Sequence, residues 1–387
     1  FSFGNQQKTP IKETKRLLND RHKLVLATVV RTKGSTPQKP GAKLLVREDG
    51  SGVGTLGGGC VEGDIWFAAQ QLLKNVGPTQ FREYQLNEDL AAEEGLVCGG
   101  TMYFMIDPIY EPEELLGFAH EINGAYSGEK PVALATLISN PGESILPLGS
   151  GIETGRKLFI REDGTTIGSL GSKSIDADAV GRGSQLMIHG SNEYVVTENG
   201  TEYFIEGYTS PPKLILVGGG HVSKAISSMA DKLGFHVYIT DDRSEFANNE
   251  RFPEAKETIA MEPAQALDQI HITKNSFIVV ATRGHKYDSD ALAAAAKTSA
   301  SYVGLLGSKR KIILIYEALV RMGLPKDRIK DLRAPIGLDI NARTPDEIAI
   351  SIMSEILMFQ LGGSGANMKL EDKLIEKIFS KNAEVLN

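Results

Sequence analysis

The first half of this chain is an internal duplication. Residues 41–60, GAKLLVREDGSGVGTLGGGC, align without a gap with residues 155–174, GRKLFIREDGTTIGSLGSKS, and ten of the twenty positions are identical. Two shorter matches flank this alignment: LATVV (26–30) with LATLI (134–138), and GTMYFM (100–105) with GTEYFI (200–205). Because both repeats must build the same unit, the residues that they share are explained by the fold, and the residues that differ are candidates for function.

Each repeat has the pattern of a small α+β domain. An apolar run leads through a turn-rich loop into a second β-rich run, which ends in the Asp-Gly turn of REDG. In the first repeat, apolar residues then follow at helical spacing: Ile65, Ala68, Ala69, Leu72 and Leu73. We therefore predict a duplicated N-terminal α+β domain, with a first repeat over residues 1–113 and a second, degenerate repeat over residues 114–210 packed against it.

Both cysteines of the chain, Cys60 and Cys98, lie in the first repeat. The GGGC that ends in Cys60 becomes GSKS in the second repeat, and the CGG that begins with Cys98 becomes ENG. The fold therefore does not need either thiol, which favours a functional role for both. The alternative is that they are two buried small hydrophobic residues.

The glycines before Cys60 predict a binding loop. Successive glycine N–H groups at the start of a helix form a concavity that binds anions, and the same positive end favours a thiolate. Polar groups of the loop at residues 33–42 are expected beside this turn, although such residues also form turns for structural reasons alone. The candidate binding groups of this repeat are Gly57, Gly58, Gly59, Cys60, Glu62, Gly99, Ser35, Thr36 and Gln38.

The second half has the pattern of a nucleotide-binding α/β domain. After the linker GYTSPPK, the segment KLILVGGGHVSKAI reads as a strand, a glycine turn and a helix, and Asp241 follows the next strand. Gly218 and Gly220 match the dinucleotide fingerprint, whereas its third glycine is replaced by Ser223. We predict an α/β chain overall, with a Rossmann-like three-layer α/β domain and a mainly parallel sheet over residues 211–361.

Polar loops after the later strands are expected at the same edge of this sheet. The carboxyl ends of parallel strands line one crevice, so groups from ATRGHKYDSD and LLGSKRK can converge there, although each alone also fits a solvated loop. The candidate binding groups of this domain are Gly218, Gly220, His221, Ser223, Asp241, Asp242, Thr282, His285, Asp288, Gly307, Ser308 and Lys309. Residues 362–387 read as a flexible linker and a short amphipathic helix.

The composition disfavours several classes of protein. The chain has 387 residues, of which 41% are hydrophobic and 24% charged, and with a formal net charge of −7 it has no basic block that would bind nucleic acid. Its longest apolar runs are far shorter than the ~20 residues that span a bilayer, so we expect no membrane partner and a cytoplasmic location. Two cysteines fall short of the four thiolates of an iron–sulfur cluster.

Taken together, the motifs resemble the XdhC/CoxI family. GSTPQKPGAKLLV, GTLGGGCVEGD and CGGTMYF are followed in the right order by VGGGHVSKAI, ATRGHKYDSDAL, YVGLLGSKRK and PIGLDINARTPDEIAISI. Members of that family are accessory proteins of molybdenum hydroxylases such as xanthine dehydrogenase. The resemblance implies that the chain binds the molybdenum cofactor (molybdopterin), protects it while a cysteine desulfurase adds the sulfido ligand, inserts it into the apo-enzyme, and forms a homodimer.

The resemblance also implies roles for the two thiols. Cys60 would be the protein ligand of the metal, Cys98 would assist or carry sulfur, and these two are the catalytic candidates. The C-terminal domain would hold a nucleotide, NAD(P) or the pterin tail. Two positions depart from the family pattern. Gln38 stands where arginine is common, and Arg283 stands where a second histidine is common, which weakens a metal or catalytic role for His285.

Two other functions remain open from the residues. One is an NAD(P)-dependent oxidoreductase that uses the Rossmann-like domain, with Asp241 on the ribose and His285 as acid or base. The other is a regulatory binding module in which neither half does chemistry. Because the chain is too short for the large molybdenum domain and lacks the cluster cysteines, we expect an accessory factor rather than the catalytic subunit of xanthine dehydrogenase.

Overall fold

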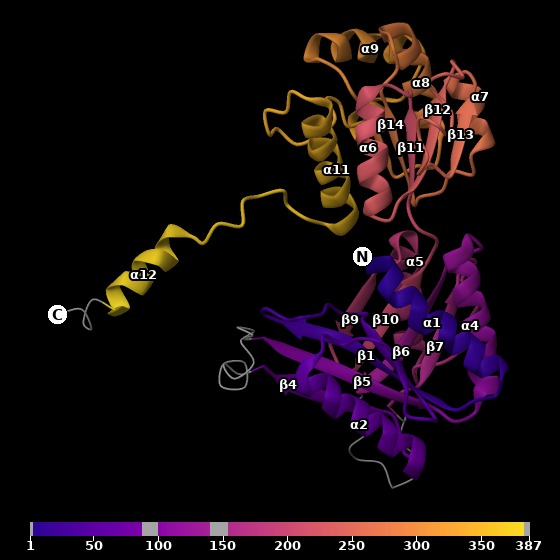
Figure 1. Cartoon of the computed structure of the whole chain (residues 1–387), viewed down its shortest axis with the longest axis vertical. Helices are drawn as coiled ribbons and strands as arrows, with labels where there is room; N and C mark the ends of the chain where they lie inside the picture. The colour runs from indigo at the N-terminus through magenta and orange to yellow at the C-terminus, as the bar shows by residue number, and fades with distance from the viewer. Residues whose placement is uncertain (1–2, 87–99, 140–153, 383–387) are drawn as a thin grey trace.

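A computed structural model describes residues 3–86, 100–139 and 154–382. Within these ranges the chain forms three five-stranded sheets (Figure 1). The first two sheets are antiparallel and come from the two N-terminal repeats, and the third is parallel and comes from the C-terminal domain. No helix in the described ranges is both long enough and apolar enough to cross a membrane.

The two repeats have the same topology. The first repeat runs α1 (Phe3–Asn19), β1 (Leu24–Lys33), β2 (Lys43–Arg47), β3 (Gly52–Gly54), α2 (Gly59–Asn75), β4 (Gln80–Gln85) and β5 (Thr101–Ile109). The second runs α4 (Pro112–Ser127), β6 (Val132–Ser139), β7 (Lys157–Arg161), β8 (Thr166–Gly168), α5 (Lys173–His189), β9 (Asn192–Val196) and β10 (Glu202–Tyr208). Their strand orders, β3-β2-β1-β5-β4 and β8-β7-β6-β10-β9, are equivalent. The predicted α+β duplication is confirmed.

Each repeat covers one face of its sheet with a helix. In the first repeat, α2 packs on Val25, Ala27 and Val29 of β1, which alternate along the strand. In the second repeat, α5 packs in the same way on Ala133 and Ala135 of β6. The opposite faces meet, and residues of both sheets form one buried cluster between them: Val30, Tyr103, Met105, Ile138 and Phe204. The two sheets therefore form a sandwich with α2 and α5 on its outer sides.

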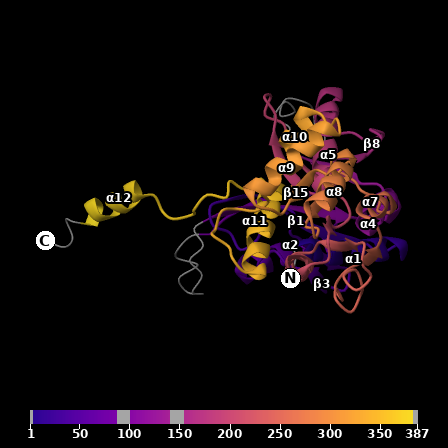
Figure 2. The ribbon, with the colours of Figure 1, turned by 90° about the horizontal axis from the view of Figure 1, so that it is seen from above.

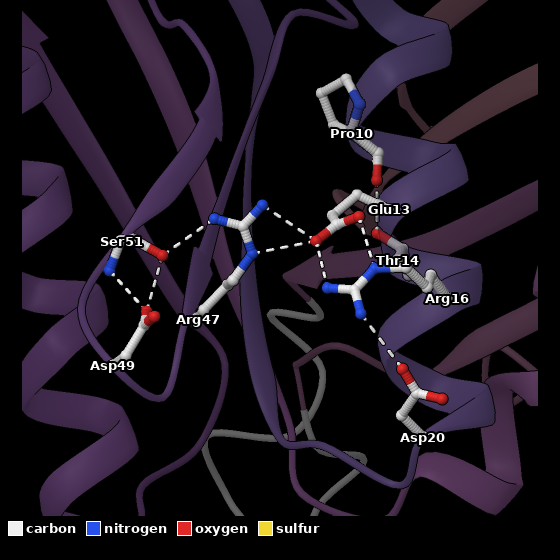
Figure 3. A network of polar contacts seen from close by, with 8 residues as sticks. All are labelled: Pro10, Glu13, Thr14, Arg16, Asp20, Arg47, Asp49 and Ser51. Carbon is white, nitrogen blue, oxygen red and sulfur yellow. Dashed lines mark hydrogen bonds and ion pairs between the residues drawn. The ribbon is translucent and has the colours of Figure 1, made fainter.

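The arginine of each REDG turn anchors the helix that begins its repeat. Arg47 pairs with Glu13 of α1 at 2.9 Å, and Arg161 pairs with Glu121 of α4 at 2.7 Å. Figure 3 shows Arg47 reaching across to Glu13, whose carboxylate also accepts hydrogen bonds from Arg16. The hydrogen bond from Arg16, with that from Arg47, lowers the pKa of Glu13 to about 2. The shared REDG motif thus fixes α1 and α4 in equivalent places.

Two buried ion pairs cross between the repeats. Lys43 of β2 contacts Glu206 of β10 at 2.8 Å, and Lys157 of β7 contacts Asp107 of β5 at 2.7 Å. The two lysines occupy equivalent positions of the repeats, and the Lys43 side chain is only 2% exposed. All four side chains line one cavity of about 70 Å³. Each repeat therefore supplies one cation and one anion to the interface.

The C-terminal domain has the predicted parallel sheet. Its elements are β11 (Lys213–Val217), α6 (His221–Lys232), β12 (His236–Asp241), β13 (Glu257–Ala260), α7 (Pro263–Gln269), β14 (Ser276–Val280), α8 (His285–Lys297), β15 (Tyr302–Leu305), α9 (Lys309–Arg321), α10 (Lys326–Asp331) and α11 (Pro345–Leu361). The strand order is β13-β12-β11-β14-β15. Helices α6 and α11 cover one face, and α7, α8 and α9 cover the other. The Rossmann-like three-layer prediction is confirmed.

A last helix stands apart from both domains. α12 (Asp372–Asn382) follows a spacer after α11, and Figure 2 shows it well away from the rest of the chain. Its apolar residues Leu374, Ile378 and Phe379 are exposed. The predicted amphipathic helix is therefore present, and the expectation of a homodimer stays a prediction.

Candidate functional site

Cys60 lies on the surface at the start of a helix. α2 begins at Gly59, and the exposed thiol of Cys60 belongs to its first turn. The loop before the helix passes through positive φ at Gly57 (116°) and Gly58 (77°), which glycine adopts without strain. A side chain built on Gly58 would meet no atom within 4 Å. The loop therefore leaves open space next to Cys60.

The carboxylate of Glu62 accepts hydrogen bonds from several residues of this loop and so holds the loop closed. It accepts hydrogen bonds from Thr55 Oγ1 (2.7 Å), Leu56 N (2.6 Å) and Gly58 N (3.1 Å). Gly57 N donates to Thr55 Oγ1 at 3.1 Å. The amides of Gly57 and Gly58 are thus already satisfied by the chain itself. An anionic ligand at these amides would have to replace these hydrogen bonds, and binding by Gly57, Gly58 and Gly59 stays a prediction.

The second repeat contains the same closure. Asp176, at the position equivalent to Glu62, accepts from Ser169 Oγ and from Leu170 N, both at 2.7 Å. Gly171 N donates to Ser169 Oγ at 3.0 Å, as Gly57 does to its threonine. The acidic residue therefore belongs to the shared fold. Glu62 thus has a structural role that both repeats share, and its role as a cofactor-binding group stays a prediction.

The two repeats differ in how the helix is capped. Before α5, the side chain of Ser172 accepts a hydrogen bond from Ile175 N at 3.4 Å. Before α2, the equivalent residue is Gly58, which has no side chain to cap the helix. The first-turn N–H groups of a helix attract negative charge. The uncapped end of α2 is thus suited to a thiolate or another anion at Cys60.

The structure brings the loop at residues 33–42 against this site. A side chain on Gly57 would lie 2.8 Å from Pro37 Cγ and 3.4 Å from Gln38 Cγ. A side chain on Gly100 would lie 2.4 Å from the carbonyl oxygen of Ser35. Thr36 Oγ1 donates to the carbonyl of Gln38 at 3.0 Å, which holds the loop in shape. Cys98 and Gly99, which precede Gly100, lie outside the described residues.

The glycine turn of the Rossmann-like domain is tightly packed on one side. At Gly218, which has φ of 113°, a side chain would come within 2.2 Å of the carbonyl oxygen of Ala281. At Gly220 a side chain would meet nothing within 4 Å. Ser223, at the third fingerprint position, is buried in the first turn of α6. Gly218 therefore makes the tight turn and Gly220 leaves an open approach, as the fingerprint requires.

Asp241, the carboxylate that is predicted to bind a ribose, forms hydrogen bonds within the protein. Asp241 accepts from Gly219 N (2.9 Å), Arg243 N (3.1 Å) and Arg243 Nε (2.9 Å). Burial raises the pKa of Asp241, but the hydrogen bonds from Arg243 and Gly219 outweigh it, so the pKa lies below its ordinary value. Arg243 lies 3.6 Å from the centroid of the Phe246 ring. A ribose would have to displace Arg243 from Asp241. The short spacing in the sequence DDR (241–243) was a signal that this arginine could pair with the carboxylate.

Several other predicted ligand groups of this domain support its structure instead. Asp288 is buried and accepts from Thr282 N (3.0 Å) and Thr282 Oγ1 (2.7 Å), and it pairs with Lys311. Ser308 caps α9 by accepting from Lys311 N at 3.4 Å. The polar groups of Thr282, Asp288 and Ser308 thus hold α8 and α9 in place, and their predicted binding roles stay predictions.

The remaining predicted groups lie at the same edge of the sheet. Asp242 pairs with Arg283 at 2.5 Å, which joins the loops after β12 and β14. His221 begins α6 and is exposed, and Lys309 begins α9 and is exposed, next to Gly307. His285 begins α8. These residues therefore follow the carboxyl ends of neighbouring parallel strands, and both their convergence on one ligand and their binding roles stay predictions. Within the described ranges, no group of three or more His, Cys, Asp or Glu could hold a metal ion.

Replacing Glu62 tests the closure of the loop. Burial raises its pKa, but the hydrogen bonds from Thr55, Leu56 and Gly58 outweigh this, so the folded pKa lies below the ordinary value of 4.5. The ionised carboxylate of Glu62 therefore contributes its full stabilisation of the folded chain above about pH 4.5. This contribution is lost as the pH falls through the pKa of Glu62 in the folded state, which is lower. We expect Glu62→Gln to lower the free energy of unfolding by about 1 kcal/mol at pH 7 in urea titrations, and by less at pH 3. Asp176→Asn is the matched variant, and an unchanged stability of Glu62→Gln at pH 7 would contradict the closure.

Comparison with known proteins gives two family matches. Residues 17–85 match the XdhC and CoxI family, and residues 214–356 match the XdhC Rossmann domain. Over 345 residues, 88% of this chain and 94% of the relative, the chain is 28% identical to a Bacillus subtilis (strain 168) protein whose name describes a probable subunit of xanthine dehydrogenase. It is 23% identical to the molybdenum cofactor insertion chaperone PaoD of Escherichia coli (strain K12), over 87% of this chain and 83% of the relative.

A solved structure is similar over almost the whole chain. It is a crystal structure from Bacillus halodurans named as a xanthine dehydrogenase, and the two superpose with a TM-score of 0.64 at 25% sequence identity. The similarity covers 93% of this chain and 98% of that one. The fold described above is thus similar to that of the solved structure over most of its length, and the Rossmann family match coincides with the C-terminal domain. This chain belongs to the XdhC and CoxI family.

Proposed function

We propose that this chain is an accessory protein of molybdenum hydroxylases, which binds the molybdenum cofactor and inserts it into a xanthine dehydrogenase-type apo-enzyme. The observation that carries the proposal is the exposed Cys60 at the uncapped start of α2, where the second repeat has Ser174 and a capped helix. A relative named as a molybdenum cofactor insertion chaperone supports it. The thiol thus occurs in only one repeat of a fold that both repeats share.

In this proposal Cys60 is the protein ligand of the metal. A thiolate is a soft ligand, and the uncapped helix end favours its negative charge. A side chain on Gly58 would meet no atom within 4 Å, so the loop before Cys60 is open at this point. Ser35 and Gln38, on the loop that contacts Gly57 and Gly100, offer hydrogen-bonding groups around it. The bound cofactor brings a metal dithiolene centre, and the residues of the chain hold and shield it.

Sulfuration of the cofactor is the second part of the proposal. Like Cys60, Cys98 occurs in the first repeat and has no counterpart in the second, where the CGG that it begins becomes ENG. We infer from this shared pattern that Cys98 assists or carries sulfur while a cysteine desulfurase adds the sulfido ligand.

An NAD(P)-dependent oxidoreductase is the second candidate, because Gly218 and Gly220 keep the turn and the open approach of a dinucleotide site. The observation against it is Asp241, which is bound to Arg243 and Gly219 and is not available for a ribose. We therefore place the accessory role first. A nucleotide held in another way, or the pterin tail, remains compatible with Gly220.

An anaerobic titration with two kinds of ligand separates the candidates. We expect the wild-type chain to retain molybdenum cofactor through gel filtration, with bound molybdenum measured by mass spectrometry. Saturating NAD(H) or NADP(H) is expected to leave the melting temperature unchanged, whereas a dinucleotide at 100 times its Kd would add about 2.7 kcal/mol to the stability. A clear dinucleotide-induced rise together with no retained molybdenum would overturn the proposal in favour of the oxidoreductase.

A further inference from the structure

The outer face of α2 carries an exposed aromatic residue in line with Cys60. Phe67 follows Cys60 by seven residues, which is two helical turns, so both residues lie on one face of α2, about 10 Å apart along its axis. Phe67 is 62% exposed, whereas Ile65 and Ala69 of the same helix are buried against the sheet. Figure 1 shows α2 on the outer side of the sandwich. The helix face that presents Cys60 therefore continues into an exposed apolar surface.

A pocket lies beside Phe67, where α2 ends and β4 begins. Its volume is about 380 Å³, and residues of both elements line it, from Phe67 on α2 to Arg82 on β4. Tyr110 holds the turn between the two elements. Its hydroxyl accepts a hydrogen bond from Gly77 N at 2.9 Å and donates to the carbonyl oxygen of Leu72 at 2.8 Å. The pocket is thus formed before a partner arrives, so less freedom is lost on binding.

Val76, which also lines this pocket, has a strained backbone. It ends α2 with φ of 42°, in the left-handed region that β-branched residues rarely adopt. The residue is 65% exposed, so little burial within the described chain offsets the strain. In the second repeat, Gly190 stands at the equivalent position with φ of 66° and makes the same turn without strain. A strained residue that the fold does not need is typical of functional sites.

The comparison of repeats also separates Phe67 from the shared fold. α2 and α5 both have 17 residues and align without a gap, which pairs Phe67 with Gly181. Each helix nevertheless packs its opposite face on its own sheet. The fold therefore needs neither Phe67 nor Val76. Both occur in the first repeat alone, as Cys60 does.

The charges around the pocket indicate the chemistry of a partner. Arg82 is the one charged residue among the described residues that line the pocket, and it donates a hydrogen bond to Gln80 Oε1 at 2.8 Å. The adjacent Glu83 lies on the opposite face of β4, because successive residues of a strand alternate. Lys74 of α2 is exposed, and Asp64 of the same helix does not line the pocket. A segment with an apolar side chain for the pocket and a carboxylate for Arg82 is complementary to this surface.

We propose that the α2 docking surface, which consists of Phe67, Val76, Arg82 and the pocket between them, binds the molybdenum hydroxylase apo-enzyme. The inference rests on the proposed function and adds the surface that receives the partner. An enzyme that takes the cofactor directly from Cys60 has to approach the face of α2 that carries this thiol. Uptake of a whole cofactor needs an extended contact beside it, whereas addition of one sulfur atom by a desulfurase needs access to a single point. The surface is therefore assigned to the apo-enzyme.

The first arm of the test measures binding of the cofactor-loaded chain to a purified, cofactor-free xanthine dehydrogenase-type enzyme by surface plasmon resonance. We expect Phe67→Ser to weaken this binding by about tenfold to a hundredfold, as for an aromatic residue at the centre of an interface. Arg82→Glu reverses the charge and should weaken it by at least about tenfold. Phe379→Ser is the matched control, because it removes an exposed ring from α12, and it should bind like wild type. All three variants should retain the cofactor like wild type.

Val76→Gly separates docking from folding. Glycine adopts the positive φ of this position without strain, so the midpoint of unfolding in urea should stay unchanged or rise. Binding of the apo-enzyme should nevertheless weaken by about threefold to tenfold, because an apolar contact is lost. Unchanged binding by both Phe67→Ser and Val76→Gly would overturn the inference and leave the proposed function standing. No retention of cofactor by wild type, measured separately, would overturn the proposed function itself.

Three further outcomes would assign the surface to another occupant and so contradict the inference. If Phe67→Ser weakened binding of the cysteine desulfurase and not of the apo-enzyme, the occupant would be the desulfurase. If it lowered the mass of the chain in light scattering and left apo-enzyme binding intact, the occupant would be a second copy. If Phe379→Ser and Phe67→Ser weakened apo-enzyme binding equally, the surface would be assigned to α12.

Discussion

Cys60→Ala is expected to lower the affinity for the molybdenum cofactor by at least about a hundredfold. Substitution of a residue that only orients a metal ligand lowers the affinity for the metal by about tenfold to a hundredfold, so substitution of the ligand itself should lower it at least as much. Cys60 is exposed, and a thiol on the surface contributes little to packing. We therefore expect unchanged stability and a large loss of binding, measured by anaerobic equilibrium filtration with molybdenum as the readout.

The second repeat supplies the matched control for this variant. Ser174 stands at the equivalent position of α5, also in the first turn of its helix. Ser174→Ala changes a residue of nearly the same size in the same local structure, and it should retain the cofactor like wild type. A Cys60→Ala protein that binds as tightly as the Ser174→Ala protein would remove Cys60 from the site.

Lys43→Met is expected to lower the free energy of unfolding of the N-terminal sandwich by about 3–5 kcal/mol. Its partner Glu206 would be left with a buried charge and no cation, and this is the costly way to break a buried ion pair. Tyr208 donates to the same carboxylate at 3.0 Å, and burial together with the charge of Glu206 holds the pKa of Tyr208 well above its ordinary value. Urea titration followed by tyrosine fluorescence measures the loss.

A double variant distinguishes a buried charge from lost packing. Lys43→Met with Glu206→Gln removes both charges and keeps an oxygen for Tyr208, so it should recover most of the stability. Lys369→Met breaks an exposed pair with Asp372 and should change the stability by less than about 1 kcal/mol. If the double variant were as unstable as Lys43→Met alone, the crossed pair would not be the reason for the loss.

The fold could be predicted from the sequence because its signals are local or repeated. The strand–glycine–helix pattern around Gly218 depends on neighbouring residues, and the shared REDG turn occurs twice. By contrast, Lys43 and Glu206 are separated by 163 positions, and nothing in their local sequence indicates that they meet. That contact follows only from the packing of the two sheets, which hydrophobic patterns alone do not specify.

The site could be predicted in part. The comparison of repeats identified Cys60, but the glycine amides were expected to be available for a ligand. Glu62 folds back over its own turn, and the presence of Asp176 at the same place in the second repeat was the signal that this acid is structural.

The most direct test of the central claim is the sulfur coordination of molybdenum in the loaded chain. X-ray absorption at the molybdenum edge should show one more sulfur ligand in wild type than in Cys60→Ser loaded under the same anaerobic conditions. Serine keeps the size of the side chain and removes the soft donor, so the difference reports on the metal bond alone. The same sulfur count in both proteins would contradict the claim that Cys60 holds the cofactor through its metal.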